Sequence, residues 1–162
     1  NYRSNINDDI SLHSKQNKTK QITLYDNTAP YTLELFQIIQ KSFPRATKLI
    51  FVIAPIPSVS DNLLSNELIM ENIVFVVFLL NQLKFKYFKR LLLMTPNILV
   101  LYIRHSVVSD ILKKLNDSFQ PLKSICNRIR RVHLDPRSFE YRGLCDNRIQ
   151  VLFPNAELLG WN

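Results

Sequence analysis

The sequence TPNILVLYI, residues 95–103, contains a pattern that recurs along this chain. Its apolar anchors Ile98, Leu101 and Ile103 lie at positions x, x+3 and x+5. A short and mostly apolar run of this kind is typical of a buried strand. Pro96 has no backbone N–H for the middle of a sheet, so it must lie outside the ladder. We therefore predict a strand from Ile98 to Ile103.

The same pattern occurs in residues 43–51 (FPRATKLIF) and in residues 153–161 (FPNAELLGW). Three weaker copies lack the proline but keep the x, x+3 and x+5 spacing. The first anchors of the six copies are Thr19, Ala46, Ile73, Ile98, Ile129 and Ala156. Successive units are therefore 27, 27, 25, 31 and 27 residues long. A nearly fixed period of this length predicts a repeat architecture.

Leucine-rich repeats have units of about 20–29 residues with a core of the form L-x-x-L-x-L. Through TPNILVLYI and FPNAELLGW, the chain resembles the leucine-rich-repeat domains of F-box-type adaptor proteins over residues 18–162. The resemblance implies an α/β solenoid with a curved parallel sheet and about six units. It also implies a protein-interaction scaffold within a multi-subunit complex, possessing the substrate-recognition role of a ubiquitin ligase adaptor. The residues contain no F-box sequence, and Pro55, His105 and Pro136 stand where the family has Asn or Cys.

A compact α/β domain with a parallel sheet is the alternative architecture, because alternating strands and helices predict it equally well. The chain has two glycines and neither a G-x-G-x-x-G nor a G-x-x-x-x-G-K motif. No loop therefore has the glycines that cradle a phosphate in the nucleotide-binding members of that class.

The periodicity predicts six strands and five helices. The predicted strands are residues 21–25, 48–53, 73–80, 98–103, 130–134 and 157–161. The predicted helices are residues 31–42, 66–71, 85–93, 107–115 and 121–127. Residues 73–80 could also form the middle of a long helix, but their β-branched and aromatic content favours a strand. We expect Ile22, Leu49, Val76, Leu101, Val132 and Leu159 to point inward.

Lys and Arg together number 21 against 13 Asp and Glu, so the net charge is +8. Such a charge favours acidic partners, including nucleic acid. Two cysteines make no disulfide framework, the first residues are not a secretory signal, and the longest apolar run, residues 73–80, is shorter than a membrane span of about 20. We expect a cytoplasmic or nuclear protein without a membrane partner. Residues 1–17 are expected to form a flexible lead-in, and the chain to be a fragment of a longer protein.

In a solenoid, the residues at x+2 and x+4 of each strand point to the concave face. The outermost strands would contribute Gln21, Thr23, Leu158 and Gly160. An apolar and aromatic patch in the middle would mark a partner site or be covered by another segment of the same protein. The predicted partner-binding residues are Lys48, Ile50, Phe75, Val77, Val100, Tyr102, Arg131 and His133.

A second candidate site is basic and could contact the phosphates of nucleic acid, as in a chromatin-associated module, because Arg binds oxyanions with two hydrogen bonds. Its residues are Arg128, Arg130, Arg131 and Arg137. The simpler interpretation is a solvated edge with ion pairs to Asp135 and Glu140.

The sequence does not indicate an enzyme. No histidine has a Cys, Ser or Asp partner at a spacing known from nucleophilic catalysis. Cys126, His133 and Cys145 do not have the spacing of a zinc site. We predict no catalytic residues, no metal, no cofactor and no small-molecule substrate.

Overall fold

The computed structural model of the chain describes residues 18–25, 31–52, 68–79, 83–112, 120–135, 147 and 149–160. Its strands form one six-stranded sheet in which every pairing is parallel and the strands lie in sequence order. The strands are β1 (Gln21–Tyr25), β2 (Lys48–Val52), β3 (Phe75–Phe78), β4 (Val100–Arg104), β5 (Arg131–Asp135) and β6 (Glu157–Gly160). The α/β class and the parallel sheet, which both predicted architectures share, are confirmed.

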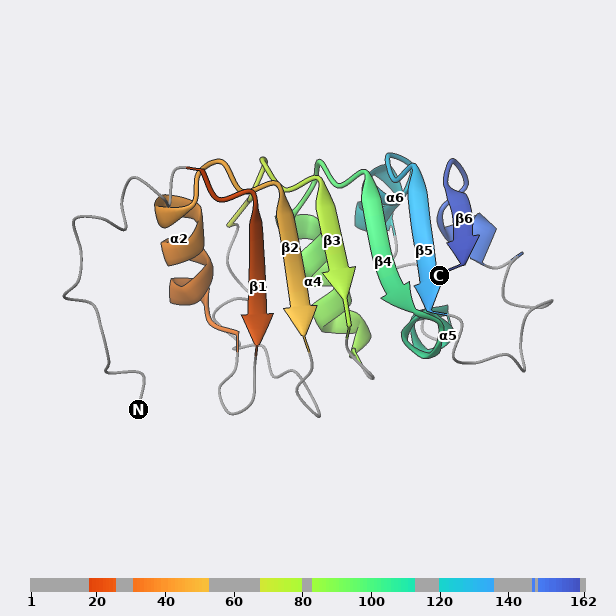
Figure 1. The fold of residues 1–162 in the computed structure, drawn as a ribbon. Coiled ribbons are helices and arrows are strands. Elements are labelled where there is room, and N and C mark those ends of the chain that lie inside the picture. Colours follow the sequence, from red (N-terminus) through yellow and green to blue (C-terminus); the bar gives the residue numbers. More distant parts are fainter. Residues whose placement is uncertain are drawn as a thin grey trace.

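The labelled helices are α2 (Leu33–Ser42), α4 (Phe85–Met94), α5 (His105–Leu112) and α6 (Gln120–Cys126). In Figure 1, α4 and α6 lie behind the strands, α2 lies beside β1 at the left, and α5 lies at the lower ends of β4 and β5. Helix α2 starts where the Thr32 hydroxyl accepts a hydrogen bond from the Leu35 amide at 3.3 Å, because Thr caps one of the free N–H groups of a helix start. These four helices agree with the sequence prediction to within a few residues, whereas residues 149–152 are also helical and no helix was predicted there.

Two uncertain segments are decided by the structure. Strand β3 lies within residues 73–80, so the prediction of a strand there is confirmed. The predicted helix over residues 66–71 is wrong for the described residues 68–71, which contain no helix. Neighbouring units satisfy the backbone there instead, since Gln40 Nε2 donates to the Ile69 carbonyl at 2.8 Å and Arg90 Nη2 donates to the Leu68 carbonyl at 3.1 Å.

The core lies between the sheet and the helices. Alternate strand residues point into it, and Leu49, Val76, Leu101 and Val132 are at most 1% exposed. Burial of each such side chain stabilises the fold by about 1.5–3 kcal/mol. A row of aromatic rings crosses this core from α2 through β2 and β3 to α4, and its members are Phe36, Phe51, Phe78 and Phe88.

The turn before each strand is the same in five units. In each turn, the amide of the first anchor donates to the carbonyl three residues earlier, at 3.0 to 3.3 Å. The donors are Ala46, Ile73, Ile98, Ile129 and Ala156. The pattern x, x+3, x+5 therefore marks a turn and a strand together.

Adjacent turns are joined by side chains that we call the rungs. In each rung, the residue just before the first anchor donates a side-chain hydrogen bond to a carbonyl in the preceding turn. The pairs are Asn72 to Pro44 at 2.7 Å, Asn97 to Glu71 at 2.9 Å, Arg128 to Pro96 at 3.4 Å and Asn155 to Asn127 at 2.9 Å. The rungs satisfy carbonyls that would otherwise need water.

The register of the last strand differs from the prediction. Val76, Leu101 and Val132 are paired neighbours, but Val132 pairs with Leu158 rather than Leu159. Before β4, the amides of Leu99 and Val100 both donate to the Val74 carbonyl. Before β6, the Glu157 amide donates to the Arg130 carbonyl, and Glu157 is already the first paired residue of the strand. A shift of one residue turns every side chain to the other face.

The predicted orientations in β6 are therefore wrong for three residues. Leu158 packs against the core, and Leu159 takes the place beside His133 that had been expected for Gly160. Gly160 itself pairs with Leu134, which also packs against the core. The other predicted inward residues, from Ile22 to Val132, are all buried.

Candidate functional site

The sheet face that points away from the described helices, which we call the open face, is the front of the sheet in Figure 1. The strand register brings the eight predicted partner-binding residues onto it in two rows. One row is Lys48, Phe75, Val100 and Arg131, and the other is Ile50, Val77, Tyr102 and His133.

A continuous stack of side chains crosses the open face from β2 to β5. The Lys48 ammonium lies 4.5 Å from the centre of the Phe75 ring. The Phe75 and Tyr102 rings stack with centres 5.2 Å apart and planes 26° apart. The Tyr102 and His133 rings are closer, at 3.8 Å and 8°. Cation–π and stacking contacts of this kind favour these ring orientations over others.

The stack decides which part of each ring is presented to a partner. Strand β4 lies between β3 and β5, so Phe75 and His133 cover the two faces of Tyr102. The ammonium of Lys48 covers Phe75 on its other side. Ring edges and polar tips are therefore available to a partner, whereas the flat faces of Phe75 and Tyr102 are occupied.

Val77 also lies on the open face, but it is only 6% exposed. It sits in its row between Ile50 on β2 and Tyr102 on β4, and it lies outside the core cluster. The open face thus covers part of its own apolar surface. The apolar patch expected from the sequence is half-buried among its own side chains.

The surroundings of His133 favour its neutral form. Partial burial lowers the pKa of His133, and the nearby positive charge of Arg131 lowers it further, while Glu157 acts in the opposite direction. A neutral imidazole can stack on Tyr102 without placing a second positive charge beside Arg131.

The predicted basic residues gather at the start of β5. Arg128, Arg130 and Arg131 are exposed there, and Arg131 Nε lies 3.7 Å from Glu157 Oε2. Asp135 lies at the other end of β5, where its Oδ2 is 3.5 Å from Arg104 Nε. Arg137 and Glu140 lie outside the described residues.

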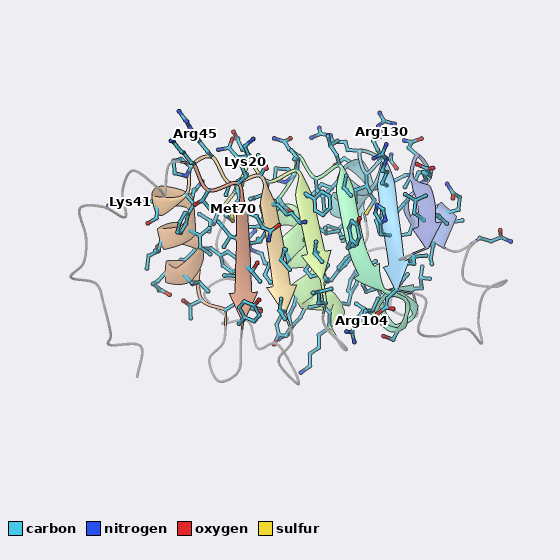
Figure 2. The ribbon with its side chains drawn as sticks, viewed as in Figure 1. Lys20, Lys41, Arg45, Met70, Arg104 and Arg130 are labelled. Carbon is cyan, nitrogen blue, oxygen red and sulfur yellow. The ribbon has the colours of Figure 1, made fainter. Side chains whose placement is uncertain are left out.

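Sequence reasoning missed a second basic group. It lies, like the first, at the N-terminal ends of the strands, which together form one edge of the sheet. Lys20 and Arg130 both stand at x+1 of their units, and Arg45 and Arg128 both stand just before a first anchor. Figure 2 shows Lys20, Arg45 and Arg130 along the same edge, at the top of the view. The repeat numbering was the signal that could have found Lys20 and Arg45.

The thiol of Cys126 is not available as a thiolate. Cys126 is buried, and burial raises the pKa of its thiol to about 12. Cys145, His13 and the side chain of His105 lie outside the described residues. Within the described part of the chain, no group of three His, Cys, Asp or Glu residues could hold a metal ion.

Comparisons of the chain with protein-family models, with curated proteins and with solved structures give no match. The described helices are all too short or too polar to cross a membrane. The functional assignment therefore depends on the geometry of the open face and of the basic edge.

Proposed function

We propose that this chain is a protein-interaction scaffold that binds a partner protein on the open face of its sheet. The stack of Lys48, Phe75, Tyr102 and His133 is the observation that carries this proposal. Aromatic side chains that combine an apolar body with a polar tip are enriched at protein interfaces. Because the stack already holds the rings in place, little side-chain entropy is lost when a partner binds.

We propose further that the units form a solenoid of the leucine-rich-repeat type. The parallel strands in sequence order, the five equivalent turns and the rungs support a structure in which each unit contacts its neighbours. By resemblance, the chain would be the substrate-recognition part of an F-box-type adaptor in a multi-subunit complex of the cytoplasm or nucleus. It would have no catalytic activity and no cofactor of its own.

The direct test is affinity capture from cell extract with the wild-type chain and with a Phe75→Ala/Tyr102→Ala variant. We expect the wild-type chain to retain a partner and the variant to lose it, because both substitutions remove rings from the centre of the open face. An Ile38→Ala/Val151→Ala variant is the matched control, since it truncates two exposed apolar side chains, 60% and 81% exposed, that lie outside the open face. Retention of the partner by the open-face variant would refute the proposed site.

A second candidate function, contact with nucleic acid, is favoured by the three exposed arginines at the start of β5 and by the net charge of +8. Phosphate contacts would make affinity fall steeply as salt concentration rises. The test is titration of labelled duplex DNA and RNA at two salt concentrations, with an Arg128→Ala/Arg130→Ala/Arg131→Ala variant alongside. Absence of binding at low salt would exclude this function.

A further inference from the structure

The basic residues at the sheet edge fall into two separate groups. All of them lie at or just before the N-terminal ends of parallel strands, so they share one edge of the sheet. The first group, over β1 and β2, is Lys18, Lys20, Arg45 and Lys48. The second group, over β5, is Arg128, Arg130 and Arg131. In the described turns and strand starts of this edge, only Glu71 and Glu157 are acidic.

The edge between the two groups has no basic residue, and it carries apolar side chains beside the exposed polar residues Glu71, Asn72 and Asn97. Val74 and Val100 are half-buried there, and Leu99 is 44% exposed. Strands β3 and β4, which separate the groups, have no basic residue at their starts. Along the edge, two basic groups are therefore separated by a stretch that contains apolar side chains and one acidic residue, Glu71.

Much of the backbone of this edge already makes hydrogen bonds within the sheet and turns, so we expect side chains to dominate recognition of a ligand. The first-anchor amides bond within their own turns, and the amides that follow them bond to carbonyls of the preceding unit. The rungs occupy the carbonyls of Pro44, Glu71, Pro96 and Asn127. Arg128 is the exception among the rungs. Its guanidinium has five N–H donors and makes only a long contact of 3.4 Å to Pro96, where the other three rungs have Asn. The remaining donors of this exposed side chain can bind an anion.

We propose that this edge binds an acidic segment of the partner protein, with two carboxylate groups separated by an apolar spacer. The proposal rests on the proposed function, because it specifies the chemistry of the partner that the scaffold binds. The carboxylates would pair with the two basic groups, and the spacer would contact Leu99. Arginine suits the carboxylate contacts because its planar fork can donate two parallel hydrogen bonds.

The strand spacing fixes the length of the spacer. Adjacent strands are about 4.8 Å apart, so β2 and β5 are about 14 Å apart across three spacings. An extended peptide advances about 3.3 Å per residue, so four or five residues span this distance. The matching sequence has two acidic pairs separated by about four residues.

Two observations favour an acidic peptide over nucleic acid. Nucleic acid has a continuous line of phosphates, whereas the basic groups are interrupted by a stretch that has no basic residue. Single strands are bound by stacking bases on free aromatic faces, whereas the faces of Tyr102 are covered by Phe75 and His133.

The experiment measures binding of a fluorescent peptide that has two glutamate pairs separated by four uncharged residues with a central leucine. A second peptide of identical composition has its four glutamates in one block. We expect the spaced peptide to bind more tightly than the block peptide, with an affinity that falls as salt is added. Equal affinities for the two peptides, or no binding of either at low salt, would overturn the proposal.

Two variants test the two basic groups separately. Lys20→Ser/Arg45→Ser removes charge from the first group, and Arg128→Asn/Arg130→Ser removes it from the second while restoring the Asn of the other rungs. Each variant should weaken binding about three- to tenfold, because exposed ion pairs contribute modestly. Lys84→Ser/Lys86→Ser is the matched control, since it makes the same charge change at the start of α4, and it should leave affinity within about twofold. An equal loss in the control would overturn the proposal.

A competition arm separates the remaining outcomes. Duplex DNA of equal charge should displace the spaced peptide poorly. If the DNA binds more tightly than the peptide, nucleic acid and not an acidic segment is the ligand of this edge, and the proposal is overturned. Binding of the peptide to the edge does not depend on Phe75 or Tyr102, which lie on the open face. Failure of the peptide to bind therefore removes this inference alone, whereas the proposed function fails only if the open-face variant keeps its captured partner.

Discussion

Two rows of aromatic side chains cross the same sheet on opposite faces, and they differ in what surrounds them. On the helix side, Phe51 and Phe78 stack with ring centres 5.2 Å apart and are at most 1% exposed. On the open face, Tyr102 and His133 stack at 3.8 Å but are only half-buried. The inner row is enclosed by apolar side chains from strands and helices, whereas the outer row has charged neighbours such as Lys48 and Arg131.

Stacking geometry alone therefore does not show which of the two rows contributes more to the stability of the fold. The free energy gained from an aromatic ring depends mainly on the apolar area removed from water, and the contact between two rings adds a smaller contribution. The inner row is therefore expected to stabilise the fold, and the outer row to shape a surface.

The largest expected effect is a difference in stability between variants of the inner row and variants of the outer row. Phe78→Ala should lower the free energy of unfolding by about 3–5 kcal/mol, because it leaves a cavity in a fully buried site. Tyr102→Ala should cost about 1 kcal/mol, since its ring is half-buried and loses mainly its stacking partners. Urea unfolding of both variants measures the two values. Equal losses would remove the distinction between the rows.

A smaller effect measures the outer stack itself. In a double-mutant cycle, the variants Tyr102→Ala and His133→Ala should show a coupling free energy of about 0.5–1.5 kcal/mol, because their rings lie 3.8 Å apart. The pair Tyr102 and Ile38 serves as a control, since Ile38 lies on α2 and is 60% exposed. A coupling energy near zero for Tyr102 and His133 would mean that the stack contributes shape without energy.

The smallest effect is the pH dependence that His133 gives to stability. Because burial and Arg131 lower the pKa of His133 in the folded chain, the unfolded chain binds a proton at higher pH than the folded chain does. The contribution of His133 is therefore present above the unfolded pKa of about 6.5, and it is lost as the pH falls from there through the lower folded pKa.

This dependence can be measured by NMR titration of His133 and by urea unfolding between pH 5 and 8. Wild-type stability should fall below about pH 6.5 more steeply than that of a His133→Gln variant, in which this titration is absent. A folded-state pKa of His133 above that of a model peptide would reverse the sign and contradict the prediction.

The sequence predicted the inner face well because alternation of apolar residues reports burial directly. Leu49, Val76 and Leu101 were assigned correctly from their spacing. The same spacing failed in β6, where Leu158 replaces Leu159 inside. This one-residue shift in register depends on which backbone amide donates to the Arg130 carbonyl. Side-chain patterns carry no information on that choice.

The sequence predicted which residues lie on the open face, but it did not predict how their side chains contact one another. The register put Phe75, Tyr102 and His133 on one face, yet their stacking depends on side-chain orientations that spacing does not fix. The sequence did not predict the rungs, because the family that the chain resembles has its Asn after the last anchor of each unit. Asn72, Asn97 and Asn155 instead precede the first anchor.

Each rung joins a turn to the turn before it, across 26 to 32 residues of chain, and the strands follow the same order. Opening one unit therefore breaks bonds with its immediate neighbours and leaves more distant units intact. Among the described strands, β6 pairs with one strand, whereas β3 pairs with two. Amide protons of β6 should exchange with solvent well before those of β3, so β6 can open while the stacked rings on β3, β4 and β5 stay in place.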